Sequence, residues 1–427
     1  MNFQNLNEDC VRHIFQFLHL DDLYAMSNVS KHFRDNVNKT KLKRKCVLTV
    51  DTPTAYNKIR KFLRRVGHHI ETIKIVEIQR ESHNLSYVYQ VTQLLQSYCY
   101  NVKHLRIEHF AGIRLTDFEQ HFDLQTLELE NSSLCSSMVL SASQQHDFNM
   151  TINALTLNTC TSGDILILLD YLKMNPKLRH LRLLNCCLCA NETMTGLFND
   201  VIISSLQHLQ CLTLDYSVKC TNLQLIADLP NLRKLFLLHF NENKLTKLFD
   251  CYANKEQCRL QEIHFHMCTI SNNSIYESLS KIKSLEVLEM CKNFGMTSNH
   301  LNIMSACKKL THLRCFDCIQ LINDEGICNL VGNCDKLRML AVYWCTGVTL
   351  ETVDRIEHIN KLTGRPHFTF KIGGRTGINW NDSGPVPSIS KIDRSTDTFT
   401  FEATNENITC QTHRHNCSSW PDFPSDH

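Results

Sequence analysis

The sequence lacks long hydrophobic runs, and this already narrows the class of protein. A membrane-spanning helix needs roughly 18 or more consecutive apolar residues, yet the aliphatic run from Ile165 to Leu169 is bounded by Asp164 and Asp170. The first ten residues, MNFQNLNEDC, lack the apolar segment of a secretory signal. We therefore expect no membrane partner and a location in the cytoplasm, the nucleus or both.

Catalytic signatures are also missing. The 13 glycines among 427 residues form no phosphate-cradling pattern, and neither Gly-x-Ser-x-Gly nor His-Glu-x-x-His occurs. We predict that the chain is not an enzyme and that it uses no cofactor and no metal. Its 43% apolar and 21% charged residues are enough for a large core, which argues against a disordered or fibrous protein.

Charge is balanced over the whole chain but not locally. The 45 Lys and Arg residues oppose 43 Asp and Glu residues, which gives a formal charge of +2. Between Lys31 and Arg65, however, twelve basic residues oppose only Asp35 and Asp51. This segment could attract acidic protein, RNA or import receptors, although a solvated linker and helix face is the simpler interpretation. Nucleic acid would become the leading partner only if the basic patch continued onto the concave surface of the domain that follows.

The first forty residues predict three short helices. Four apolar residues recur at helical spacing, namely Val11, Ile14, Phe15 and Leu18. Asn7, Asp21 and Ser30 can each cap the start of one helix. A unit this small buries too little area to be stable alone, so a neighbour or a partner is expected to complete its apolar face.

The same segment resembles the F-box in the order of its residues. The matching residues are Leu6, Glu8, Asp9, Val11, Ile14, Phe15, Leu18, Asp22, Leu23, Val29, Lys31 and Phe33. Asn7 stands where the family usually has proline, and Ser30 where it often has cysteine. The resemblance implies docking onto the Skp adaptor of a Skp-cullin-F-box ubiquitin ligase. The implied adaptor-binding residues are Leu6, Asn7, Val11, Ile14, Leu18, Leu23 and Val29. The alternative is an ordinary helical cap on the following domain.

Downstream, the pattern Leu-x-x-Leu-x-Leu-x-x-Cys/Asn recurs about eleven times. Its starting residues are Ile70, Val102, Leu124, Ile152, Leu178, Leu209, Leu232, Leu260, Leu285, Leu310 and Leu337. Their spacing is typical of leucine-rich repeats, and the last two units resemble the cysteine-containing subclass found in many F-box proteins. The sequence thus predicts an α/β fold: a leucine-rich-repeat solenoid shaped as a horseshoe, with parallel strands on the concave face and helices on the convex face.

These patterns divide the chain into four parts. We expect an F-box helical domain at 1–45, a basic linker or capping helix at 46–69, the solenoid at 70–372 and a flexible tail at 373–427. Within the tail, the segment from Asp382 to Ser388 resembles a phosphodegron, although a simple turn is favoured. Four possible metal ligands there, Cys410, His413, His415 and Cys417, would have to be ordered at an entropic cost, so a metal site is not favoured.

Many of the 22 cysteines acquire structural roles in this pattern. The ninth position of six repeats holds a thiol or an amide, which should form an internal ladder: Cys160, Cys186, Cys268, Asn293, Cys318 and Cys345. Three more cysteines, Cys99, Cys307 and Cys334, fit the packed end of a helix. The spacing of Cys315 and Cys318 is therefore interpreted as core positions rather than a zinc site. A reactive thiol at Cys187 or Cys189 is the alternative to an ordinary loop.

The alternation of a strand places the third, fifth and seventh residues of each repeat on the concave face. Aromatic and arginine side chains are over-represented at binding hot spots. The predicted substrate-binding residues are Arg182, Phe236, His266, Arg314, Phe316, Tyr343 and Trp344. The alternative is that these are strand residues with no bound partner. His264 and His266 share one side of a strand, but no third ligand is visible, so a solvated pair is favoured over a metal site.

The leading functional hypothesis is a non-catalytic substrate receptor. The amino-terminal helices would hold the Skp adaptor and, through it, the cullin scaffold, while the repeats capture a protein substrate. Binding would then act by raising the local concentration of the substrate's lysines. The alternative is a repeat scaffold that binds protein or RNA without ubiquitin chemistry.

Overall fold

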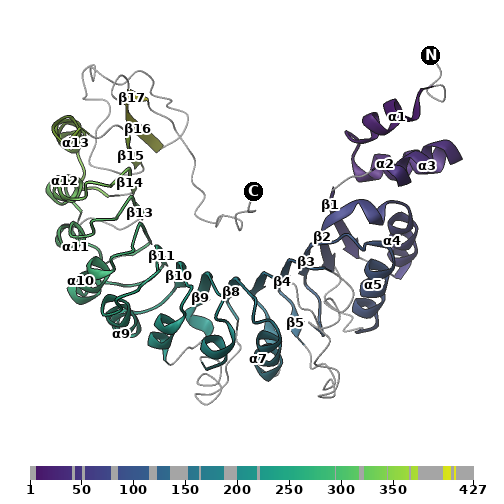
Figure 1. Cartoon of the computed structure of the whole chain (residues 1–427), viewed down its shortest axis with the longest axis horizontal. Helices are drawn as coiled ribbons and strands as arrows, with labels where there is room; N and C mark the ends of the chain where they lie inside the picture. Colours follow the sequence, from purple (N-terminus) through teal and green to yellow (C-terminus); the bar gives the residue numbers. More distant parts are fainter. Residues whose placement is uncertain are drawn as a thin grey trace. The chain divides into compact units, whose positions relative to one another are not determined.

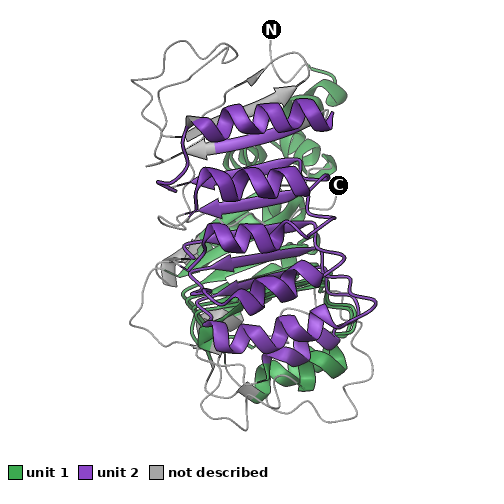
Figure 2. Ribbon diagram, turned by 90° about the vertical axis from the view of Figure 1, so that its left-hand side faces the viewer, with its two compact units in different colours: residues 1–222 green, residues 223–427 purple. Residues whose placement is uncertain are grey.

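The computed structural model describes residues 6–40, 44–50, 53–77, 85–114, 123–134, 152–162, 165–186, 200–218, 222–293, 295–316, 322–343, 345–364, 367–373, 398–404 and 408–409. The chain divides into two compact units, Met1–Asn222 and Leu223–His427, which are coloured separately in Figure 2. Each unit contains a largely parallel sheet. Among the helices in the described ranges, none combines the length and the apolar character needed to cross a membrane.

Unit 1 begins with three helices, as predicted: α1 (Glu8–Phe15), α2 (Leu20–Val29) and α3 (Lys31–Lys39). Asn7 caps α1 by accepting a bond from the Asp9 amide at 3.2 Å, and Ser30 caps α3 by accepting one from the Phe33 amide at 3.1 Å. The predicted cap at Asp21 is wrong, because α2 already begins at Leu20. Asp21 lies instead in the first turn, where its charge favours the helix dipole.

The sheet of unit 1 has seven parallel strands in the described residues, in the order β1-β2-β3-β4-β6-β8-β9. They are β1 (Arg44–Val50), β2 (Ile70–Glu77), β3 (His104–Glu108), β4 (Thr126–Glu130), β6 (Ala154–Asn158), β8 (His180–Leu184) and β9 (Cys211–Asp215). A second, short pair consists of β5 (Ser133–Leu134) and β7 (Thr161–Ser162). The helical segments are α4 (Pro53–Val66), η2 (Gly67–His69), α5 (Leu85–Tyr98), α7 (Ile165–Met174) and η3 (Tyr216–Val218).

The strand ladder starts earlier than predicted. The segment 46–69 was expected to be a basic linker or capping helix, yet β1 pairs in parallel with β2 and α4 follows it. The helix was predicted and the strand was not. In β1, Cys46 and Leu48 are buried and Val47 is exposed, which is the alternation of a strand. The sequence did not reveal this alternation because a run of basic residues precedes it.

Unit 2 continues the strand–helix alternation (Figure 1). Its parallel strands are β10 (Lys234–Leu238), β11 (Glu262–His266), β12 (Val287–Cys291), β13 (His312–Phe316), β14 (Met339–Tyr343) and β15 (His367–Gly373). Its helical segments are η4 (Leu223–Asp228), α9 (Glu242–Ala253), α10 (Asn273–Lys281), α11 (Ser298–Met304), α12 (Asp324–Asn333) and α13 (Leu350–Thr363). Successive helices contact one another and form a layer on one face of the sheet (Figure 2). We call the other face the strand face.

Two further strands differ from the sequence prediction. β16 (Thr398–Thr404) pairs antiparallel with β15, and β17 (Ile408–Thr409) pairs antiparallel with β16. Both strands fall in the segment 373–427 that was predicted to be a flexible tail. The phosphodegron-like segment and the Cys–His cluster of that tail lie outside the described residues.

Each of the eleven predicted repeats forms a strand. All eleven starting residues are at most 2% exposed, and apart from β2 each strand begins two residues after its start. Neighbouring strands pair equal positions, as when His312 faces Met339, both third in their repeats. The fourth and sixth residues point inward; Leu313 and Cys315 are 0% and 1% exposed. The described chain is therefore an α/β protein of the leucine-rich-repeat type, preceded by the three-helix segment that resembles the F-box.

The predicted internal ladder is confirmed where it is described. Three thiols lie near the carbonyl oxygen at the sixth position of the preceding strand: Cys160 to Leu129 at 3.3 Å, Cys186 to Leu157 at 3.4 Å and Cys268 to Leu237 at 3.3 Å. Asn293 is fully buried and accepts a bond from the Ile270 amide at 3.0 Å. Cys345 is also fully buried, while Cys318 lies outside the described residues.

A second regularity was not predicted. The eighth residue of seven repeats adopts a left-handed backbone with φ between 48° and 66°: His109, Asn131, Thr159, Asn185, His239, Met267 and Lys292. A non-glycine residue costs about 1–2 kcal/mol in this conformation. The cost is offset by hydrogen bonds to the next strand, such as Met267 N to Cys291 O at 2.9 Å. No glycine marks these turns, so the sequence gives no signal for them.

Candidate binding surfaces of the F-box and the strand faces

The F-box helices bury some of the predicted adaptor-binding residues among themselves. Of the predicted residues, Val11 and Leu23 are 0% exposed. Phe15 is also 0% exposed, and its ring meets the Phe33 ring edge to face at 6.0 Å. These side chains fill the interior of the three-helix segment. A partner could reach Val11 or Leu23 only if the helices moved apart.

Other predicted adaptor-binding residues lie at the surface. Val29 is 63% exposed at the end of α2, and Leu6, Ile14 and Leu18 are half-buried. Asn7 is exposed and is used as the cap of α1. The sequence reasoning missed Phe17, which is 75% exposed and lies outside the predicted apolar spacing. Exposed apolar side chains of this size are available to a partner.

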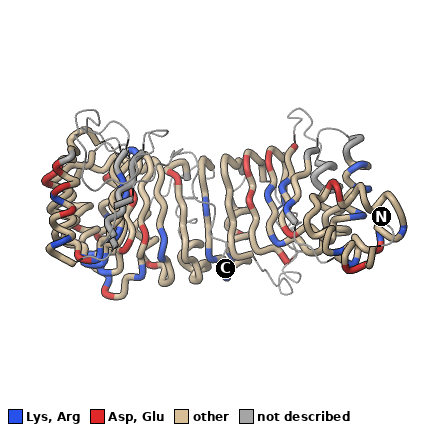
Figure 3. Tube along the Cα trace, turned by 90° about the horizontal axis from the view of Figure 1, so that it is seen from above, with Lys and Arg blue, Asp and Glu red and all other residues tan. Residues whose placement is uncertain are grey.

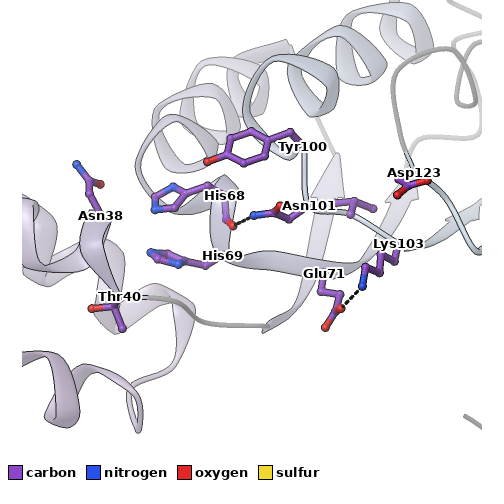
Figure 4. A pocket seen from close by; sticks show the side chains of 10 residues that line it. Asn38, Thr40, His68, His69, Glu71, Tyr100, Asn101, Lys103 and Asp123 are labelled. Atoms are coloured by element: carbon purple, nitrogen blue, oxygen red, sulfur yellow. Dashed lines mark hydrogen bonds and ion pairs between the residues drawn. The ribbon is translucent and has the colours of Figure 1, made fainter. Parts of the chain in front are cut away.

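The F-box rests against the first repeat. The Tyr24 ring of α2 lies 5.4 Å from the Phe62 ring of α4, so a neighbouring element completes the apolar face as expected. A pocket of about 600 Å³ lies beside this junction (Figure 4), and it is lined by Asn38, Thr40, His68, His69, Glu71, Tyr100, Asn101, Val102, Lys103 and Asp123.

The chemistry of this pocket is mixed. The rings of His68 and His69 lie 3.9 Å apart, and Lys103 pairs with Glu71 at 3.3 Å. Burial lowers the pKa of His68, which favours its neutral form. Because charges of both signs line the pocket, it does not select a ligand of one charge.

The strand face of unit 1 carries a paired charge network. Arg106 lies 2.7 Å from Glu108, 2.5 Å from Glu130 and 3.5 Å from Glu128, and Lys74 lies 2.8 Å from Glu108. Figure 3 colours the basic and the acidic residues along the backbone. Burial raises the pKa of Glu108, but its bonds to Lys74 and Arg106 outweigh this and lower it. The sequence placed these residues at the fifth and seventh positions of adjacent repeats, but they were not among the predicted site residues.

The strand face of unit 2 is organised around His264. Its ring stacks on Phe236 of the preceding strand, with centroids 4.2 Å apart and planes 12° apart. Its Nδ1 lies 3.4 Å from Glu289 and its Nε2 lies 3.8 Å from Glu262, which are ion-pair rather than short hydrogen-bond distances. Arg314 lies 3.1 Å from Glu289. The prediction of a solvated histidine pair is wrong for His264, because it is 7% exposed.

Opposing effects set the protonation of this cluster. Burial alone would lower the pKa of His264, but the bonds and charges of Glu262 and Glu289 outweigh it and raise that pKa. Burial would likewise raise the pKa of Glu289, yet His264 and Arg314 outweigh it and lower that pKa. The shifts in pKa therefore favour the protonated form of His264 and the ionised form of Glu289, although neighbouring side chains cover both residues.

The late aromatic residues are brought together. Phe316 stacks on Tyr343 at 4.8 Å with planes 12° apart, next to Arg314. Tyr343 is only 4% exposed, and burial raises its pKa to about 12. Tyr343 thus packs behind the partly exposed ring of Phe316, and little of its own side chain is accessible to a partner. Trp344 lies outside the described residues.

The remaining predicted substrate residues are more separate. His266 is half-buried on β11, and its ring meets that of His239 edge to face at 6.4 Å. Burial lowers the pKa of His266, and the positive charges of His239 and Lys292 lower it further. Arg182 lies on β8 of unit 1, whereas the other predicted substrate residues that are described lie in unit 2.

The buried cysteines among the described residues pack in the core of the repeats. Cys315 is 1% exposed, and its thiol lies 3.8 Å from the sulfur of Met296. Burial raises the pKa of Cys46 and of Cys307 to about 12, which keeps both thiols protonated. Among the described residues, no group of three or more His, Cys, Asp or Glu is arranged to hold a metal ion. Cys187 and Cys189 lie outside them.

Comparison with known proteins supports the assignment of the first segment. Residues 3–45 match the F-box domain, so the chain contains an F-box domain, although this match covers a small part of its length. No curated protein matches the chain.

The solved structures that are similar to the chain include the following two. One is an internalin (inlF) from Listeria monocytogenes, with 12% identity, 79% of this chain and 92% of that chain covered and a TM-score of 0.37. The other is the complex of Rad7 and Elc1 in yeast, with 13% identity, 82% of this chain and 79% of that chain covered and a TM-score of 0.40. Likeness at this level carries no argument about function.

Proposed function

We propose that this chain is the substrate-recognition subunit of a Skp-cullin-F-box ubiquitin ligase. The observation that carries the proposal is the F-box domain at residues 3–45, folded as three helices that leave Val29 and Phe17 exposed. An F-box domain implies binding to the Skp adaptor, and the adaptor in turn connects to the cullin scaffold. We propose that the complex acts in the cytoplasm, the nucleus or both.

The repeats supply the second half of the proposal. The strand faces carry aromatic and charged side chains that a protein can contact, with Arg314 and Phe316 adjacent in unit 2. The thiol ladder supports membership of the cysteine-containing subclass of leucine-rich repeats. In this reading the chain performs no bond-making step: it holds a protein substrate near the ubiquitin-transferring subunits, which raises the effective concentration of the substrate's lysines.

Co-purification from cells tests the proposal. We expect Leu18→Asp and Val29→Asp to lose the Skp adaptor, because each places a charge on a surface that adaptor docking would bury. Leu362→Asp is the matched control, since Leu362 is 74% exposed on α13, and it should keep the adaptor. Circular dichroism should show the repeats intact in all three variants. Adaptor retained by both F-box variants would refute the proposal.

A repeat scaffold that binds protein or RNA without ubiquitin chemistry is the second candidate. Asn7 and Ser30, which depart from the F-box pattern, favour it. Salt dependence separates the two: adaptor docking through apolar side chains survives moderate salt, whereas RNA binding weakens steeply as salt rises.

A further inference from the structure

Helix α4 has two chemically different faces. One face is apolar: Ile59, Leu63 and Val66 are 8%, 1% and 0% exposed. The other face is basic, because Lys58, Arg60, Lys61 and Arg64 are exposed and Arg65 is half-buried. The sequence of α4 contains no acidic residue. We call these five basic residues the basic face of α4.

The basic face is unpaired within the described part of the chain. None of its five side chains forms an ion pair or a hydrogen bond with a described residue. The fold pairs many other cations, as in Lys39 with Glu8 at 3.3 Å, Lys74 with Glu108 at 2.8 Å and Lys234 with Glu262 at 3.1 Å. Among the described residues, the positive charge of α4 is therefore not paired with acidic side chains, unlike that of the strand faces.

This arrangement also places like charges beside one another. Lys58–Lys61 and Lys61–Arg64 are three residues apart, and Arg60–Arg64 and Lys61–Arg65 are four apart, so each pair lies on the same side of the helix. Like charges at these spacings destabilise a helix. A bound polyanion would offset this repulsion, so binding an anionic partner would stabilise helix α4.

The chemistry of the face selects among polyanions. Insertion into a membrane surface requires the apolar face of a helix, and in α4 that face is buried in the fold, so an anionic membrane would be held by charge alone. A protein interface is centred on buried apolar or aromatic side chains, but the exposed residues described on α4 are Asn57 and four basic residues. Single strands are held by exposed aromatic rings on which bases stack, and none is exposed here. A duplex held through its phosphates needs neither exposed apolar side chains nor exposed aromatic rings.

We propose that the basic face of α4 docks duplex nucleic acid through its phosphate backbone, without reading its sequence. The helix rises 1.5 Å per residue, so the face spans roughly 10 Å, an axial length over which the two strands of a duplex carry about six phosphates. Three of the five residues are arginines, whose guanidinium groups can bind phosphate oxygens bidentately. The five residues differ from the predicted adaptor-binding residues of α1 and α2. Because they lie on a helix and not on a strand face, duplex binding here is an addition to the proposed adaptor and substrate binding and not the leading function.

Titration of the full chain with a labelled 20-base-pair DNA duplex at several salt concentrations tests the proposal. If all five residues contact phosphates, log Kobs should fall with log salt with a slope of about −4.5. The triple variant Lys58→Gln, Lys61→Gln and Arg65→Gln should reduce the slope to about −1.8 and weaken binding at 50 mM salt at least about a hundredfold. The single variant Lys61→Gln should reduce the slope by about 0.9.

A matched triple variant removes the same charge elsewhere. Lys283, Lys309 and Lys336 are exposed in unit 2, and their replacement by Gln should leave duplex binding unchanged. Equal losses in the two triple variants would overturn the proposal, as would tighter binding of a single strand or of an acidic peptide of equal charge. The α4 variants should keep the Skp adaptor, and Val29→Asp should keep the duplex, so this proposal and the proposed function fail separately.

Discussion

At the scale of single residues, the repeat pattern predicted which side chains lie on the strand face but not which side chains they pair with. The fifth position of the repeat identified His264, Glu289 and Arg314 as strand-face residues, and the structure confirms their positions. Their pairing could not be predicted, because it depends on strands about 25 residues apart lying in exact register. His264 was predicted to be solvated for the same reason, because the side chains of adjacent strands that bury it could not be known from the sequence.

The pH dependence of stability should report the environment of His264. Its folded pKa is raised, so it contributes stability below its unfolded pKa near 6.5 that is lost as pH rises through the folded pKa. Each unit of that rise corresponds to about 1.4 kcal/mol. Glu262 and Glu289 face it, with Lys234 and Arg314 beyond them. Urea unfolding at pH 5.5 and 8.5 should show a smaller change in His264→Gln than in wild type.

The control for this measurement is His358→Gln, which replaces an exposed histidine of α13. It should leave the difference between the two pH values as in wild type. The carboxylates act in the opposite sense: the lowered pKa of Glu289 adds stability above its unfolded pKa that is lost as pH falls through the folded pKa. An unchanged pH dependence in His264→Gln would contradict the ion-pair account.

The thiol ladder gives a second prediction at this scale. Cys268→Ala should lower the free energy of unfolding by about 1–3 kcal/mol, because it removes the contact of the thiol with the Leu237 carbonyl and opens a small cavity. Cys251→Ala, at an exposed position on α9, should change it by less than about 0.5 kcal/mol. Equal effects in urea titrations would show that the ladder is not a source of stability.

At the scale of elements, the eleven repeat strands followed from the sequence because their apolar period is short and regular. β1 was missed because it precedes the first full repeat and follows a basic run, and β16 and β17 were missed because their composition lacks the pattern. The left-handed eighth residues were missed because no glycine marks them. The unpaired basic face of α4 needed the structure, because a charge run alone does not show which charges are neutralised.

Close packing between coils predicts a glycine requirement at Gly295. A Cβ there would lie 2.5 Å from the Ile270 carbonyl oxygen and 2.8 Å from its carbon, so Gly295→Ala should destabilise the protein by about 1–3 kcal/mol. Gly332 of α12 has no atom within 4 Å of its added Cβ. Gly332→Ala should therefore stabilise the protein by about 0.5–1 kcal/mol, as alanine does in helices. Thermal unfolding of both variants checks the opposite signs.

At the scale of the whole molecule, the sequence predicted the order of parts: an F-box segment followed by leucine-rich repeats. It did not predict that Val11 and Leu23 would belong to the interior of the F-box, because one helical period cannot tell a core face from a docking face. The structure separates the two by exposure, which directs the adaptor test to Leu18 and Val29.

Reconstitution with purified Skp adaptor tests the central claim most directly. The full chain and the adaptor are mixed at micromolar concentrations and separated by size-exclusion chromatography coupled to light scattering. The account predicts a one-to-one complex that persists at moderate salt and is absent for Val29→Asp. Separate elution of the wild-type chain and the adaptor would contradict it.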